Sequence, residues 1–422
     1  MIENIATLEK YNFWHDNLPE TGFIREQYLN NINNYLENKL VKVLVGQRRT
    51  GKSYLLRQLI FALFKKGIKP QNVLYINKEF TDFDFIKNYD NLDKLVSLYK
   101  LHLKPEGKIY LFIDEVQDIE GWERLVNSYS QSYIDNYEIF ITGSNSQLLS
   151  GELASLLSGR YIQFQIMPFS YSEFLGVLNI ARSKESFLQY MQTGGLPELY
   201  NLPNDETKRY YLSAIKDTVL LRDIIQRYQI KDARLLEDIF VFLINNASNL
   251  ISISNIINYF KTKNRKTNYE TISNYISYLK NTFLLHQVDR YNIKGKETIS
   301  GTNKFYANDL SYKNYLYPGF EYGFGYLLEN LVYLQLINVG FTVYTGVLRN
   351  REIDFVALKG DRTIYFQVTY MLVDKSTIER GYSELESIND NYEKYVVSLD
   401  DLQLTNRNGI KHVLAWELDG IL

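Results

Sequence analysis

The chain has 422 residues, of which 45% are hydrophobic and 23% are charged, and its formal net charge is -2. This composition is typical of a folded protein of two to four domains, and the charge excludes a protein that is basic over its whole surface. Cysteine is absent and the four histidines are scattered, which excludes disulfides, thiolate zinc sites and a cysteine nucleophile.

Neither a targeting segment nor a membrane segment is visible. The first residues, Met1 to Asn4, lack the basic and apolar regions of a secretory signal peptide. Runs of 18 apolar residues, the length that a membrane-spanning helix needs, do not occur. We therefore expect a cytoplasmic protein without membrane contact.

The strongest motif lies near the start of the chain. Residues 46–53, GQRRTGKS, fit the pattern G-x-x-x-x-G-K-[ST] between a predicted strand at 40–45 and a predicted helix at 54–64. In such a loop backbone N–H groups face phosphate oxygens, Lys52 reaches the β and γ phosphates, and the Ser53 hydroxyl takes a Mg²⁺ position. We expect a nucleoside triphosphate to be bound by Gly46, Gln47, Arg48, Arg49, Thr50, Gly51, Lys52, Ser53 and Tyr54.

Two later strands supply the acidic and polar residues that this chemistry needs. The apolar strand at 108–115, KIYLFIDE, ends in Asp114, predicted to hold Mg²⁺, and Glu115, predicted to polarise the attacking water. The strand at 137–142 leads into a Gly-Ser-Asn-Ser turn, where Ser144 or Asn145 suits a group that contacts the γ phosphate. A turn that contacts no ligand is an alternative interpretation of this last segment.

Strands and helices alternate over the first 168 residues. Apolar strands are predicted at 40–45, 73–77, 109–113, 139–142 and 161–166. This alternation predicts an α/β fold with a parallel sheet, helices on both faces, and a site at the carboxyl ends of the strands. We predict a P-loop core at 1–168 and a helical extension at 169–230.

Residues 231–312 are predicted to form a winged helix-turn-helix. Helices at 233–245, 254–260 and 268–281, followed by strands at 284–291 and 304–308, have the order of that fold. Residues 255–300 contain eight Lys and Arg against three acids, a stripe that suits the phosphates of double-stranded DNA. Protein–protein contact and plain solvation of these cations are equally open alternatives.

The whole chain resembles the prokaryotic AAA-type ATPases of the archaeal-ATPase-like group. That group combines a P-loop core, a winged helix and a C-terminal domain related to restriction-endonuclease folds. The resemblance is carried by GQRRTGKS at 46–53, LFIDEVQDIEGWE at 111–123, ITGSNSQLL at 141–149, LSGRY at 157–161, MPFSYSEFL at 167–175, GGLPE at 194–198 and REIDFV at 351–356.

The resemblance implies that the nucleotide is ATP. It also implies that Arg160 stabilises charge on the transferred phosphoryl group, either in its own subunit or in a neighbouring one. Only an Arg160 that acts on a neighbouring subunit requires an oligomer. The oligomeric state therefore stays open between monomer, dimer and hexamer.

The C-terminal segment, 313–422, is predicted to be a compact α/β unit. In PD-(D/E)xK nucleases, which the resemblance suggests, a helix glutamate, a strand aspartate and an acid-x-lysine on the next strand hold Mg²⁺. The counterparts are Glu329, Asp354 and Gln367, where Gln367 replaces the acid and Thr369 replaces the lysine. We therefore expect an incomplete nuclease site.

Three hypotheses for the function stay open. The first is a Mg²⁺-dependent ATPase that couples ATP binding and hydrolysis to domain rearrangement, on DNA or on another partner. The second is an ATP-dependent nuclease that uses the C-terminal segment. The third is a nucleotide-switched regulator that binds DNA or protein and turns over little ATP.

Overall fold

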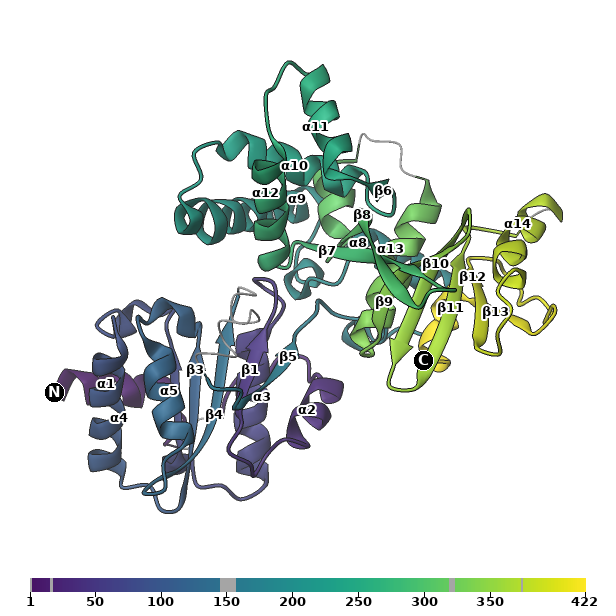
Figure 1. Ribbon diagram of the computed structural model, residues 1–422. Coiled ribbons are helices and arrows are strands. Elements are labelled where there is room, and N and C mark those ends of the chain that lie inside the picture. Colours follow the sequence, from purple (N-terminus) through teal and green to yellow (C-terminus); the bar gives the residue numbers. More distant parts are fainter. Residues whose placement is uncertain (1, 16–17, 145–156, 319–322, 373–374) are drawn as a thin grey trace. The chain divides into compact units, whose positions relative to one another are not determined.

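The computed structural model describes residues 2–15, 18–144, 157–318, 323–372 and 375–422. The chain divides into two compact units, Met1–Ile166 and Met167–Leu422, and each is built around its own sheet (Figure 1). Within the described ranges, no helix combines the length and the apolar character needed to span a bilayer.

The first unit contains a five-stranded sheet in the order β2-β3-β4-β1-β5, and every neighbouring pair is parallel. This arrangement confirms the predicted parallel α/β core. Because β4 lies between β1 and β3, the segments that follow these three strands meet at one edge of the sheet. The strands are β1 (Val41–Val45), β2 (Val73–Asn77), β3 (Lys108–Asp114), β4 (Asn136–Gly143) and β5 (Tyr161–Gln165).

Helices cover both faces of this sheet (Figure 1). They are α1 (Ile2–Tyr11), α2 (Glu26–Asn33), α3 (Lys52–Lys65), α4 (Tyr89–Leu103) and α5 (Trp122–Ser130). Leu55, Leu56 and Leu59 of α3 pack in the same buried cluster as Phe112 and Phe140, whose rings stack at 4.4 Å. This packing holds the first turn of α3 against the carboxyl end of β1.

A buried charge cluster ties the amino-terminal half of the same sheet together. Lys42 of β1 and Glu138 of β4 form an ion pair, and both side chains are fully buried. Lys108 of β3 also contacts the Glu138 carboxylate, at 3.1 Å, and the backbone N–H of Glu37 donates to it at 3.1 Å. Burial lowers the pKa of Lys42, and the Glu138 carboxylate opposes this shift.

The second unit contains an eight-stranded mixed sheet in the order β13-β12-β11-β10-β9-β7-β8-β6. Its strands are β6 (Leu250–Ile251), β7 (Leu285–Asn292), β8 (Glu297–Ala307), β9 (Thr342–Leu348), β10 (Arg351–Lys359), β11 (Arg362–Val368), β12 (Glu393–Ser398) and β13 (Ile410–Leu414). Its α-helices are α7 (Tyr171–Leu178), α8 (Lys184–Thr193), α9 (Asp205–Thr218), α10 (Ala233–Asn245), α11 (Ile253–Thr262), α12 (Tyr269–Asn281), α13 (Phe324–Asn338) and α14 (Lys375–Glu386), and residues Val219–Gln226 continue α9 as a π-helix.

The β7–β8 hairpin is part of this larger sheet. Strand β7 pairs in parallel with β9, and Arg290, Tyr291 and Asn292 lie opposite Thr345, Gly346 and Val347. The position between residues 312 and 313, where the sequence predicts a domain boundary, is therefore spanned by one sheet. Residues of α7 and α8 also share a hydrophobic cluster with α13, so the three segments predicted after residue 168 pack as one unit.

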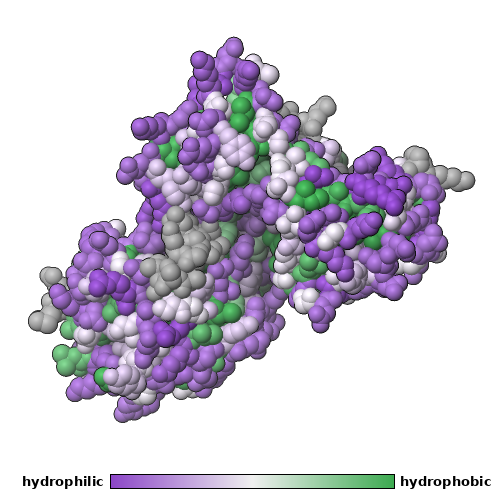
Figure 2. Space-filling view, in the orientation of Figure 1, coloured by the Kyte–Doolittle hydropathy of each residue, from purple (hydrophilic) through white to green (hydrophobic). Residues whose placement is uncertain are grey.

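The apolar residues of each unit lie mainly in its interior. Figure 2 shows a mostly hydrophilic face with scattered apolar residues. The exposed apolar side chains include Tyr133, Ile134 and Leu101 of the first unit. Single exposed apolar residues are common on folded proteins.

The charge cluster of the first unit yields a stability prediction. Glu138→Ala should lower the free energy of unfolding of the first unit by about 3–5 kcal/mol, because it leaves the ammonium of Lys42 buried and unpaired. Urea denaturation of the full chain, followed by circular dichroism, measures this loss. The double variant Lys42→Met/Glu138→Leu should recover most of it, and an equal loss in the double variant would show that packing, rather than charge, sets the cost.

Candidate functional site

The loop between β1 and α3 is held in one shape by its own contacts. Gly46 passes close to the chain after β5, where an added Cβ would lie 2.3 Å from the carbonyl oxygen of Ile166. Gly51, at the start of α3, has φ +92°, a conformation that glycine adopts without strain. The Thr50 hydroxyl donates to the carbonyl of Gln47 at 2.9 Å. The glycines of the motif therefore stand where other residues would clash or be strained.

A buried arginine supports this loop from outside the motif. Arg25 is 2% exposed, and its Nη1 donates to the carbonyl of Thr50 at 3.1 Å. The backbone N–H of Arg25 donates to Oε1 of Gln58 on α3, also at 3.1 Å. Nothing in the local sequence pattern predicts that Arg25 contacts a loop 25 residues away.

Lys52 points back across the loop. Its Nζ donates to the carbonyls of Gly46 and Gln47, at 2.9 and 3.0 Å, and lies 3.9 Å from a carboxylate oxygen of Glu115. Burial lowers the pKa of Lys52, and the nearby carboxylates of Glu115 and Asp114 oppose this. The loop carbonyls and Glu115 thus hold the ammonium at the centre of the site.

Asp114 is fully buried at the end of β3 and is surrounded by hydroxyl groups. Its Oδ1 accepts from the Thr142 hydroxyl, its Oδ2 accepts from the Tyr75 hydroxyl at 3.1 Å, and Ser53 also hydrogen-bonds to it. Burial, with a smaller effect of Glu115, raises the pKa of Asp114 to about 6, while the hydrogen bonds and Lys52 oppose the shift.

Glu115 follows Asp114 in a left-handed backbone conformation, φ 54°, which is uncommon for a residue other than glycine. Its carboxylate accepts from Nε2 of Gln117 and hydrogen-bonds with Ser144, and its backbone N–H donates to Oγ1 of Thr142 at 2.9 Å. Burial would raise the pKa of Glu115, but Lys52 and Arg48 outweigh burial and lower it. This residue is therefore set up as an ionised carboxylate beside Lys52.

These residues fit Mg²⁺ with a nucleoside triphosphate. Mg²⁺ prefers oxygen ligands, and the Ser53 hydroxyl and the Asp114 carboxylate are already within hydrogen-bond distance of each other. The first turn of α3 presents backbone N–H groups and the positive end of its dipole to an anion. Lys52 adds a full positive charge next to that turn. The residues at this edge of the sheet therefore have the chemistry that a magnesium–triphosphate complex requires.

Asn145 lies outside the residues that the structure describes, and Arg160 lies apart from the other predicted residues. Arg160 is exposed and precedes β5, whose first residue pairs with Val41 at the amino-terminal end of β1. The loop at 46–53 follows the opposite end of the five-residue β1, about 16 Å away at ~3.3 Å per residue. Arg160 therefore lies at the far edge of the sheet from Lys52 of its own chain.

The remaining predicted residues have separate surroundings. Tyr54 is 42% exposed, and the Arg57 guanidinium lies 4.0 Å from the centre of its ring. Arg48 pairs with Glu79 at 3.3 Å, at the margin of the loop. Arg49 has a left-handed backbone, φ 67°. In the second unit, Glu329 and Asp354 are brought together around Lys304, which the sequence analysis did not identify.

Comparisons with known proteins agree with the geometry of the first unit. Residues 38–175 match the family model described as an AAA domain, and residues 184–321 match a domain of unknown function (DUF8612). An uncharacterised protein of Haemophilus influenzae is 35% identical over 400 residues, which cover 93% of this chain and 98% of that protein. The uncharacterised protein MJ1544 of Methanocaldococcus jannaschii is 33% identical over 396 residues, covering 89% of this chain and 83% of that one.

Among solved structures, the Walker-type ATPase of Pyrococcus abyssi matches with a TM-score of 0.46 and 17% identity. The match covers 69% of this chain and 96% of the Pyrococcus protein.

The hydroxyl groups around Asp114 yield a titration prediction. The Asp114 carboxyl should titrate near pH 6. The ¹³C chemical shift of this carboxyl, recorded as a function of pH, measures the titration. Thr142→Val should raise this pKa further, because the hydroxyl stabilises the charged form, whereas Thr142→Ser should leave it unchanged.

Since the folded pKa of Asp114 exceeds the ordinary value of 3.8, the folded state binds this proton more tightly than the unfolded chain does. The contribution of Asp114 to stability should therefore fall as the pH rises from 3.8 to about 6. A midpoint near 4 would contradict this account.

Proposed function

The chain belongs to the same family as the uncharacterised Haemophilus and Methanocaldococcus proteins, and because its residues 38–175 match an AAA domain, we propose that it is a Mg²⁺-dependent ATPase with its catalytic site in the first unit. The observation that carries the proposal is the meeting of Lys52, Ser53, Asp114 and Glu115 at one edge of the five-stranded sheet. These four groups supply the charge and the oxygen ligands that phosphoryl transfer requires.

Each residue has a distinct role in the proposed reaction. Lys52 exchanges its contacts with the loop carbonyls for the β and γ phosphates of ATP. Ser53 and Asp114 would hold Mg²⁺, which would neutralise charge on the phosphates. Glu115, kept ionised by Lys52 and Arg48, orients the attacking water and accepts its proton. Thr142 fixes both acids, because its hydroxyl donates to Asp114 and accepts from the backbone of Glu115.

We also propose that Arg160 acts on a neighbouring copy of the chain. It lies at the sheet edge opposite its own Lys52, and its guanidinium has no ion-pair partner among the residues that the structure describes. In the proposed assembly, this exposed guanidinium lies next to the nucleotide of a second molecule. The proposed enzyme is therefore complete only as an oligomer.

The geometry gives less support to contact with DNA. The order α10, α11, α12, β7, β8 is the order expected of a winged helix. However, Arg265 pairs with Asp232 and Asp238. Lys280 hydrogen-bonds to Gln287, and burial lowers the pKa of Lys280. Arg290 also donates to the Thr302 hydroxyl at 3.1 Å, and the Lys263 ammonium lies 4.5 Å from the centre of the Tyr259 ring. Four of the eight cations between 255 and 300 thus have contacts within the unit. We therefore rank a DNA-stimulated activity below the ATPase itself.

The ATPase proposal is tested by separating binding from hydrolysis. Glu115→Gln should retain ATP binding, measured by calorimetry, and lose phosphate release by about 10²–10⁴-fold, because it removes the proton acceptor but keeps the shape of the side chain. Lys52→Ala should lose both.

A wild-type chain that binds ATP but releases no phosphate, with or without DNA, would leave the nucleotide-switched regulator as the better hypothesis. The absence of any ATP binding would contradict both.

The proposed role of Arg160 has its own test. Arg160→Ala and Lys52→Ala should each be inactive alone, with a loss of about 10³–10⁵-fold for the arginine variant. A mixture of the two should regain phosphate release, because a mixed assembly contains some sites with an intact Lys52 next to an intact Arg160. A wild-type rate per chain that does not change on dilution to the monomer, measured with light scattering, would contradict action on a neighbour.

A further inference from the structure

The second unit contains a cluster of one buried lysine and three carboxylates, two of them buried. Nζ of Lys304, on β8, lies 2.8 Å from Glu329 of α13, 2.8 Å from Glu352 of β10 and 3.5 Å from Asp354 of β10. The side chain of Lys304 is only 3% exposed. Two of these acids, Glu329 and Asp354, are the residues at which the resemblance predicts a nuclease metal site.

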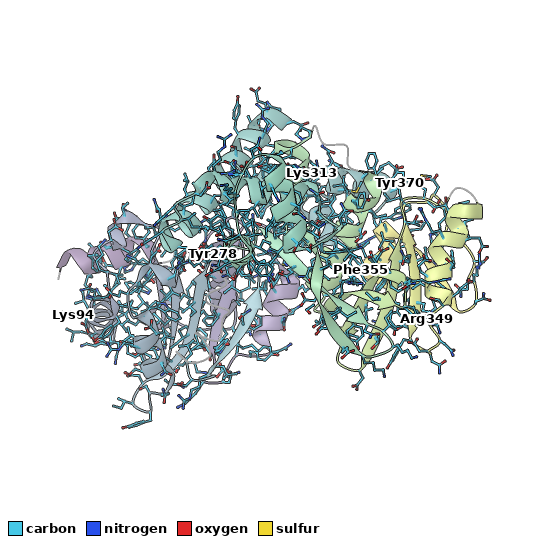
Figure 3. The ribbon with its side chains drawn as sticks, turned by 45° about the horizontal axis from the view of Figure 1, so that its top comes forward. Lys94, Tyr278, Lys313, Arg349, Phe355 and Tyr370 are labelled. Carbon is cyan, nitrogen blue, oxygen red and sulfur yellow. The ribbon has the colours of Figure 1, made fainter. Side chains whose placement is uncertain are left out.

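The cluster is fixed by further hydrogen bonds. The Tyr306 hydroxyl donates to Glu329 at 2.7 Å, and the backbone N–H of Val368 donates to Oδ2 of Asp354 at 2.8 Å. The pairing of β10 with β9 is irregular between Ile353 and Val356, a bulge of the kind that redirects a side chain. Phe355 (labelled in Figure 3) anchors this bulge, because it is fully buried against Tyr306.

The charges of the cluster compensate one another. Burial would lower the pKa of Lys304, but Glu329, Asp354 and Glu352 outweigh it and raise the pKa, so the lysine is a permanent cation. Burial raises the pKa of Glu329 to about 7, and the Lys304 ammonium opposes the shift. An ammonium has three N–H donors and no acceptor, and three carboxylates surround this one.

The arrangement does not fit a bound Mg²⁺. Mg²⁺ needs oxygen ligands at about 2.0–2.1 Å, and the carboxylates here are spaced around a nitrogen at 2.8–3.5 Å. Within the described part of the chain, no group of three acidic, histidine or cysteine side chains is placed to hold a metal ion. Gln367, at the position of the missing acid, has a buried Oε1 without a hydrogen-bond partner among the described residues.

We propose that the ammonium of Lys304 is the resident cation of this acidic site and that it excludes Mg²⁺ and Mn²⁺ from it. The nuclease pattern has a lysine where this chain has Thr369. Lys304 provides a lysine from another strand, and it pairs with the acids instead of assisting cleavage. Because its donors face the carboxylates, Lys304 has none left to steady an attacking water. The second unit is therefore not a metal-dependent nuclease, and its acids serve to bind their own lysine.

The site remains close to solvent, which makes the proposal testable. Glu352 and Asp354 line a cavity of about 330 Å³ together with Arg351, Gln367 and Arg380. The Glu352 side chain is 38% exposed. Small cations therefore have a path to the carboxylates, and Lys304 itself is what keeps them out.

The experiment measures Mn²⁺ binding to nucleotide-free full-length protein by electron paramagnetic resonance. Every sample carries Asp114→Asn, so that the site of the first unit does not contribute. The protein with Lys304 intact should bind no Mn²⁺ at the cluster. Lys304→Met, which removes the charge but keeps the length of the side chain, should gain a Mn²⁺ site at least about tenfold tighter than any other on the protein, since the three carboxylates lose their ammonium partner and can close around the metal ion. Its melting temperature should fall without metal and recover with Mn²⁺.

Two control variants separate the metal site from a general change in charge. Lys304→Arg keeps the cation and should stay insensitive to Mn²⁺. Lys304→Met/Asp354→Asn loses a ligand and should lose the gained site. The proposal is overturned if Lys304→Met folds and gains no Mn²⁺ site. It is also overturned if protein with Lys304 intact binds a Mn²⁺ that Asp354→Asn abolishes, a measurement that decides the matter even if Lys304→Met does not fold.

Discussion

The parallel pairing of β4 between β1 and β3 is the constraint on which the site of the first unit depends. It brings the ends of three strands to one edge, so that Lys52, Asp114 and Thr142 meet there although up to 90 residues separate them in the chain. The Thr142 hydroxyl then fixes two successive acids at once. Without that strand order, the loop and the acids would not lie close together.

Much of this edge could be predicted from the sequence. A loop motif needs only local residues, and apolar runs of five or more residues predict buried parallel strands. Arg25, Tyr75 and Thr142 could not be found in this way, because each reaches its partner through the fold and has no local pattern of its own. Thr142 had the best available signal, since it ends a predicted strand beside the predicted turn.

The second unit was harder to predict for the same physical reason. Its helices α10 to α12 have clear 3.6-residue periodicity, and their predicted ranges agree with the structure to within two residues. The parallel contact of β7 with β9 links strands that are about 50 residues apart, and only the fold shows it. Likewise, the missing lysine at Thr369 was visible, whereas Lys304, on another strand, could not be connected with Glu329 and Asp354.

The shared sheet of the second unit limits the positions at which the gene can be divided without disrupting the fold. A gene break near residue 312 would strip β7 from β9 and leave a row of unpaired backbone groups, which invites aggregation. A break near residue 166 crosses no strand pairing of either sheet. Recombination would therefore be expected to exchange the P-loop unit as a module and to transmit everything after it as an indivisible block.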